Sequence, residues 1–124
     1  MTQPPLKLYK ALFAAQKEMP IIPKKGKGQH GPCSKLEDII DATKPILEKH
    51  GLMIVQTYAL PAIRGAEDIV DFENCLQTDL IHVESGEYIR SLYWLVAKPD
   101  FLSYGAATTY HRKYAQLCIL NLAS

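Results

Sequence analysis

The stretch that decides the fold runs from Asn74-Cys-Leu-Gln-Thr-Asp-Leu-Ile-His-Val83 through Glu84-Ser-Gly-Glu87 to Tyr88-Ile-Arg-Ser-Leu-Tyr-Trp-Leu-Val-Ala97. Both long segments carry β-branched or aromatic residues, which favour strands. The short polar segment between them, centred on Ser85-Gly86, is typical of a hairpin turn. We therefore expect two neighbouring antiparallel strands joined by a tight turn.

A third strand is expected upstream of this hairpin. The segment Leu52-Met-Ile-Val-Gln-Thr-Tyr-Ala-Leu60 is rich in strand-forming residues, and Pro61 ends it. Residues 61–73 read as an acidic loop, and Lys98-Pro99 ends the last strand. Because the three strands follow one another with short connections, they favour an antiparallel meander over a parallel sheet.

Two helices are expected before the sheet. The first runs from about Leu6 to Glu18, because Pro4-Pro5 suits a first helical turn. The second follows Ser34 and Glu37, whose spacing predicts a capping box. Its apolar positions recur at helical spacing, at Leu36, Ile39, Ile40, Ile46 and Leu47.

The end of this second helix is marked by Gly51, which suits a left-handed terminating residue. Pro45 lies inside the helix and is expected to kink it or weaken one turn.

A last, long helix is expected from about Ser103 to Leu122. We expect Ala106, Tyr110, Tyr114 and Leu117 to pack on the sheet. Thr108, Thr109, Arg112 and Gln116 would then lie on the opposite, polar face, with Lys113 at the border.

Together these elements predict a single α+β domain over residues 1–124. Two N-terminal helices precede a three-stranded antiparallel meander, and the long C-terminal helix packs on the sheet. The composition agrees with one packed core, because 48% of the residues are hydrophobic and 22% are charged, which excludes a disordered chain.

Charge is segregated along the chain although the net charge is only +1. Seven lysines and Glu18 give residues 1–35 a charge of +6, while five bases and twelve acids give residues 36–100 a charge of −7. Residues 101–124 add Arg112 and Lys113. This asymmetry suits a nucleic-acid footprint or complementary surfaces for self-association, or simply solvated faces.

The segment Pro23-Lys-Lys-Gly-Lys-Gly-Gln-His-Gly-Pro32 reads as a loop or hairpin tip. Lys24, Lys25 and Lys27 on such a glycine-rich loop could donate to phosphates together with its N–H groups. No Ser or Thr follows a Gly-Lys pair, so this is not a Walker loop. The alternative is an ordinary flexible loop that lysines keep soluble.

No catalytic or metal-binding constellation stands out. The four histidines and three cysteines show no metal-ligand spacing, so we expect no metal and no cofactor. The odd, widely spaced cysteines, the absence of a signal peptide and the lack of a long apolar run favour a cytoplasmic protein without a membrane anchor. A third alternative is a small enzyme that uses a Cys–His or carboxylate pair, whose members the fold brings together from distant positions in the sequence.

Aromatic and basic residues alternate in two places, Tyr88 to Trp94 and Tyr104 to Tyr114. Binding of single-stranded nucleic acid uses these two ingredients, since cations bind phosphates and flat rings stack on bases. For Trp94, Tyr110 and Tyr114 we favour a place in the core. The first segment contains Arg90, and the second contains His111, Arg112 and Lys113.

The segment Gly105-Ala-Ala-Thr-Thr-Tyr-His-Arg-Lys-Tyr114 resembles the signature of the ERF (essential recombination function) family of phage and prophage single-strand annealing proteins. Leu8-Tyr-Lys-Ala-Leu12, Leu36-Glu-Asp-Ile-Ile40 and Lys44-Pro-Ile-Leu-Glu-Lys-His-Gly-Leu52 resemble other blocks of that family in the same order. The chain departs from the family pattern at Ala106, Lys113 and Gln116 and in the stretch from Gly31 to Lys35.

The resemblance implies a protein that binds single-stranded DNA and promotes annealing of complementary strands in homologous recombination, without ATP and as a homo-oligomer, in a ring or filament. It also implies a phage or prophage origin, and a host single-strand-binding protein as a partner through the family's variable C-terminal region. The alternative is an assembly domain that forms homo-oligomers without binding DNA. The candidate DNA contacts are Arg112, Lys113, Lys24, Lys25, Lys27, Lys35, Arg90, Thr108 and Thr109.

Overall fold

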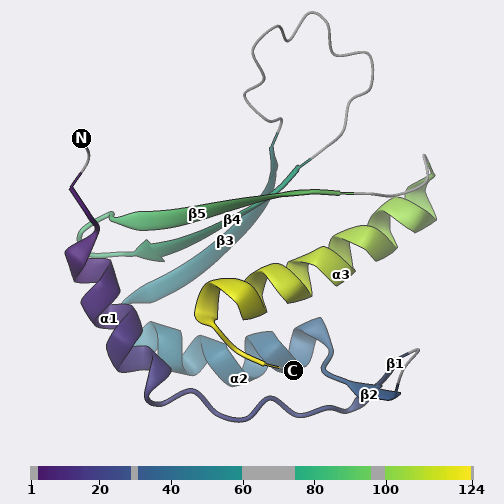
Figure 1. The fold of residues 1–124 in the computed structure, drawn as a ribbon, viewed down its shortest axis with the longest axis horizontal. Coiled ribbons are helices and arrows are strands. Elements are labelled where there is room, and N and C mark those ends of the chain that lie inside the picture. Colours follow the sequence, from purple (N-terminus) through teal and green to yellow (C-terminus); the bar gives the residue numbers. More distant parts are fainter. Residues whose placement is uncertain (1–2, 29–30, 60–74, 96–99, 124) are drawn as a thin grey trace, which may run out of the picture.

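The computed structural model describes residues 3–28, 31–59, 75–95 and 100–123. Along the chain it has α1 (Leu6–Gln16), β1 (Gly26–Gly28), β2 (Gly31–Cys33), α2 (Leu36–Lys49), β3 (Leu52–Ala59), β4 (Cys75–His82), β5 (Tyr88–Trp94) and α3 (Phe101–Leu120). This is the predicted α+β order of two helices, three strands and a helix, with a small additional hairpin (Figure 1). The acidic segment 61–73 and Lys98-Pro99, for which a loop and a strand end were predicted, lie outside the described residues.

The sheet is the predicted antiparallel meander, in the order β3-β4-β5. Leu52 pairs with His82 at one end of β3 and β4, and Cys75 pairs with Trp94 between β4 and β5. The turn lies at Ser85-Gly86 as predicted, and Gly86 adopts φ 74°, a backbone conformation that a side chain would strain.

All three helices lie on one face of this sheet (Figure 1). Because paired residues of an antiparallel sheet point to the same face, Leu52, Ile54, Leu80 and Ile89 share the covered face. They pack with Leu8, Leu47 and Leu120 from the three helices in the main core. The other face carries Met53, Val55, Tyr88, Leu92 and Trp94, which are all exposed among the described residues.

The expected burial of Trp94 is therefore wrong, since this side chain is 43% exposed. The apolar run from Leu92 to Trp94 suggested a buried strand, but β5 is an edge strand on which Trp94 points to the open face.

The glycine-rich segment forms the hairpin β1–β2, with Gly26 paired to Cys33. A Cβ at Gly26 would lie 3.0 Å from both the Cys33 carbonyl oxygen and Lys35 Cγ, so only glycine fits there without a shift. The hairpin thereby lies directly beside the beginning of α2 (Figure 1).

The predicted cap of α2 is displaced by one residue. Lys35, not Ser34, is the extended residue before the helix, and the Asp38 carboxylate accepts a hydrogen bond from its backbone N–H at 3.2 Å. The helix continues through Pro45 to Lys49, and Gly51 follows with φ 70° as the predicted left-handed residue.

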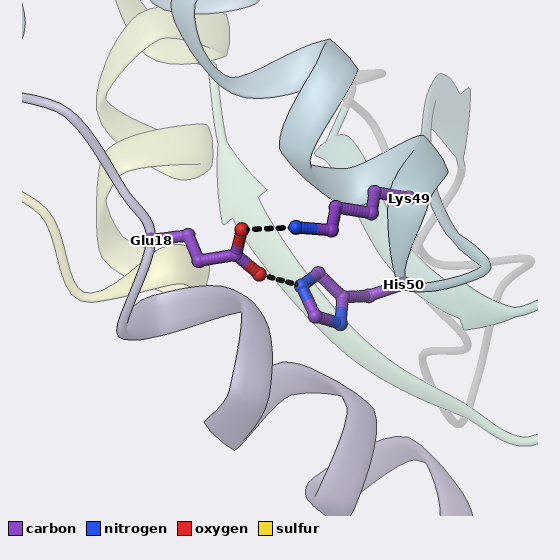
Figure 2. A network of polar contacts seen from close by, with 3 residues as sticks. All are labelled: Glu18, Lys49 and His50. Atoms are coloured by element: carbon purple, nitrogen blue, oxygen red, sulfur yellow. Dashed lines mark hydrogen bonds and ion pairs between the residues drawn. The ribbon is translucent and has the colours of Figure 1, made fainter.

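Helix α1 is held at both ends by side chains from other elements. The Leu8 N–H donates to Glu87 in the β4–β5 turn at 2.9 Å, which satisfies one of the unpaired donors of the first turn. After the helix, the Glu18 carboxylate binds Lys49 and His50 at the end of α2 (Figure 2). Hydrogen bonds from Lys49 and then His50 hold the pKa of Glu18 below its usual value of 4.5.

Glu18→Gln is expected to lower the melting temperature near neutral pH. A lowered folded-state pKa gives stability that is present above about pH 4.5 and is lost as the pH falls through the folded value. The difference from the wild type should therefore shrink in thermal melts at about pH 3 compared with about pH 7. The control is Glu48→Gln, an exposed position on α2. An equal deficit at both pH values would contradict the ion-pair role.

Candidate nucleic-acid interface

Helix α3 is fixed at its two ends by local capping. The Asp100 carboxylate accepts a hydrogen bond from the Ser103 N–H at 2.8 Å, and this contact lowers the pKa of Asp100. At the other end Asn121 takes the left-handed conformation with φ 57°. Between these caps, apolar and polar residues are spread almost evenly around the helix, so no strong apolar stripe sets its rotation.

Leu117 and Leu120 near the end of α3 are buried in the core, and the middle of the helix is bonded by Gln56, a polar residue on the covered face of β3. Its amide oxygen accepts from Arg112 Nε at 3.0 Å and from Gln116 Nε2 at 2.8 Å. Its amide nitrogen donates to the Thr78 hydroxyl at 3.1 Å and to the Arg112 carbonyl at 3.2 Å. One side chain thus ties the middle of α3 to two strands.

The predicted orientation of α3 is consequently wrong for six residues. Gln116, expected on the polar face, is buried against Gln56, and Ala106, expected on the sheet, is exposed. Arg112 and Thr108 face the sheet, since Thr108 Oγ1 lies 2.8 Å from the Tyr58 hydroxyl of β3. Tyr110 and Tyr114, expected in the core, are 57% and 40% exposed. Only Leu117 of the predicted apolar face is buried as expected.

Aromatic contacts hold α3 against β5 as well. The rings of His111 and Tyr93 lie 4.5 Å apart, and burial lowers the pKa of His111 below its usual value. The neutral imidazole is therefore favoured at this contact.

Three predicted DNA contacts meet in a hollow of about 690 Å³ between the beginning of α2 and the first half of α3. Lys35 directly precedes α2, and Thr109 and Lys113 come from α3. Lys113 is only 9% exposed, and its Nζ lies 4.6 Å from the centre of the Tyr114 ring. Thr109 is exposed, with its hydroxyl donating to the Gly105 carbonyl at 3.2 Å.

Arg112 lines a second hollow, of about 270 Å³, between α2, β3 and α3. Lys44, a cation that sequence reasoning did not single out, lines the same hollow. Arg112 uses Nε for Gln56, and within the described residues the terminal nitrogens of its guanidinium make no hydrogen bond or ion pair. Those nitrogens can fork onto two oxygens of one phosphate.

Arg90 lies elsewhere, on the open face of the sheet. Its Nε and Nη2 bind the two oxygens of Asp79 at 2.8 and 3.0 Å across the β4–β5 pair, which raises the pKa of Arg90. This arginine already has a bidentate carboxylate partner and is separated by the sheet from the cations of α2 and α3.

The remaining predicted contacts precede α2. Lys24 and Lys25 are exposed in the segment before β1. Lys27 lies in β1 opposite Pro32, and its side chain lies outside the described part of the chain.

Two residues of this region escaped sequence reasoning. The sequence predicts Ser34 as the cap of α2, a position that Lys35 occupies. It places Gln56 in a strand and predicts no contacts for its side chain. A signal for Gln56 existed, because it alternates with Leu52 and Ile54 and so falls on the buried face, where a polar group needs partners.

The fold and the site define a class: an α+β domain whose cations gather on two helices that cover one face of a meander. A model of the ERF superfamily matches residues 8–124, and the chain therefore belongs to the ERF superfamily. This membership supports a role in phage recombination and strand annealing. Searches of curated proteins and of solved structures each gave no match. No helix in the described ranges is long and apolar enough to span a bilayer.

Gln56→Ala is expected to destabilise the protein by about 1–3 kcal/mol, because it leaves the buried Gln116 amide without its acceptor. Urea unfolding measures this difference. Thr57→Ala, an exposed change on the same strand, should cost less than about 0.5 kcal/mol. A Gln56→Ala midpoint equal to that of the wild type would show that Gln56 does not hold α3.

Proposed function

We propose that this protein binds single-stranded DNA and, as a homo-oligomer, promotes annealing of complementary strands without ATP. The observation that carries the proposal is the match of residues 8–124 to the ERF superfamily. The gathering of Lys35, Lys44, Arg112 and Lys113 beside α2 and α3 supports it. Lys44, Arg112 and Lys113 come from segments that resemble the family.

The chemistry required for this function is modest. Phosphate contacts position a strand without reading its sequence, and they leave the base edges free to pair with a second strand. Base pairing then supplies both the specificity and the energy of annealing. Lys24 and Lys25, exposed before β1, add charge near the same end of α2.

Self-association is supported by the open face of the sheet. Met53, Val55, Tyr88, Leu92 and Trp94 are exposed there, and the Asp79–Arg90 pair neutralises the charge among them. A second copy of this chain is the occupant that we propose for this face. Several associated copies on one DNA strand would bind it at many weak phosphate sites at once, and the high effective concentration would raise the overall affinity.

This same open face favours the second candidate function, an assembly domain that forms oligomers without DNA. The two candidates differ in the cations of α2 and α3. Assembly through the open face has no need of Arg112, because Arg112 lies on the covered side of the sheet.

Arg112→Met is expected to weaken binding of a labelled oligothymidylate by about tenfold or more, since one charge-assisted contact is lost. The dependence of log K on log salt should fall by about 0.7. Fluorescence anisotropy over a salt series gives both values. An annealing assay with complementary DNA strands and no added ATP should show the same loss.

The matched controls separate charge from structure. Lys10→Met removes an exposed lysine of α1 and should leave affinity unchanged, whereas Arg112→Lys keeps the charge and should retain more affinity than Arg112→Met. Oligomers in light scattering without any binding of the oligothymidylate by the wild type would reject the DNA function in favour of the assembly domain.

A further inference from the structure

The hollow between α2 and α3 contains polar groups that lack partners. Ser34 directly precedes Lys35, the N-cap residue of α2. Ser34 is 1% exposed and lines this hollow. Within the described residues its hydroxyl has no hydrogen-bond partner. Buried hydroxyls are nearly always paired, so an unpaired one on a residue that lines a hollow is a candidate to bond a group that enters the hollow.

Lys113 likewise lacks an ion-pair partner among the described residues. It is nine-tenths buried. Its Nζ lies over the face of the Tyr114 ring. Because a buried ammonium is costly without a counter-charge, this position favours an anion in the hollow.

The beginning of α2 supplies further donors to the same place. The backbone N–H groups of Leu36, Glu37 and Asp38 belong to the first helical turn, which has no acceptors of its own. Leu36 and Glu37 line the hollow together with Lys35. A helix N-terminus carries a partial positive charge, which attracts anions.

Two carboxylates near the hollow oppose an anion. Glu37 lines the hollow, and the Asp38 carboxylate accepts from the Lys35 N–H at the same helix N-terminus. An anion there is held by two lysines and the helix N-terminus against these two groups, so removing the charge of Glu37 should strengthen its binding.

We propose that this hollow is a phosphate-binding site, in which Ser34, Lys35, Lys113 and the first N–H groups of α2 hold the phosphate oxygens. Phosphate fits because it takes several hydrogen bonds at once and carries the missing negative charge. The phosphate comes either from a DNA backbone, in which case the inference rests on the proposed function and locates one of its contacts, or from a free phosphate ion.

The test uses the full chain with two probes, inorganic phosphate in calorimetry and a labelled oligothymidylate in anisotropy. Ser34→Ala and Lys113→Met should each weaken phosphate binding about tenfold, and Glu37→Gln should strengthen it. Lys10→Met is the control for a lost lysine outside the hollow. Circular dichroism and thermal melts verify the fold, and Lys113→Arg, which keeps the charge, should retain binding if Lys113→Met does not fold.

The outcomes distinguish the two sources. A parallel loss for both probes assigns the site to the DNA backbone, and so does a loss of oligothymidylate binding when inorganic phosphate alone is too weak to detect. A loss confined to inorganic phosphate assigns the site to the free ion. Phosphate binding by a wild type that does not bind the oligothymidylate keeps the site and rejects the proposed function. Variants that bind both probes like the wild type, or a wild type that binds neither, would overturn the inference.

Discussion

The hydrogen bonds of Gln56 are the interaction on which the arrangement of the site depends. Helix α3 has no strong apolar face along its length, and Leu117 and Leu120 near its end are buried in the core. Together with these leucines, Gln56 fixes which side of α3 meets the sheet, because it bonds Arg112 and Gln116 of α3 while it bonds Thr78 of β4. With this rotation, Lys113 faces the beginning of α2, and Tyr110 and Tyr114 face solvent. A polar network thus sets the position of the cations, and the apolar core secures the layers beneath it.

A second constraint is that three helices share one face of a three-stranded sheet. The covered face holds the core, and the open face keeps exposed apolar residues together with the neutral Asp79–Arg90 pair. The proposed DNA contacts and the proposed contact between copies therefore lie on opposite sides of the sheet. Two functions that use different faces can operate together, which is what annealing by an oligomer requires.

Much of the fold was predictable because its signals are local. The Ser85-Gly86 turn, the strand segments and Gly51 after α2 follow from turn chemistry and propensity, and the antiparallel β4–β5 pair follows from its short connection. The rotation of α3 was not predictable from periodicity, since its apolar and polar residues alternate without a stripe. The site was predicted in part: Lys35, Thr109 and Lys113 do meet, while Arg90 is held by Asp79, its cross-strand partner in the register. The unpaired hydroxyl of Ser34 depends on a one-residue shift of a cap, which no sequence pattern specifies.

The central claim is that single-stranded DNA binds on the side of the sheet that α2 and α3 cover. Amide hydrogen exchange, followed by mass spectrometry with and without an oligothymidylate, tests this claim most directly. The account predicts slower exchange on binding in peptides that contain residues 34–40 and 106–114. Slower exchange confined to residues 88–94 of the open face, with no change in those two segments, would contradict it.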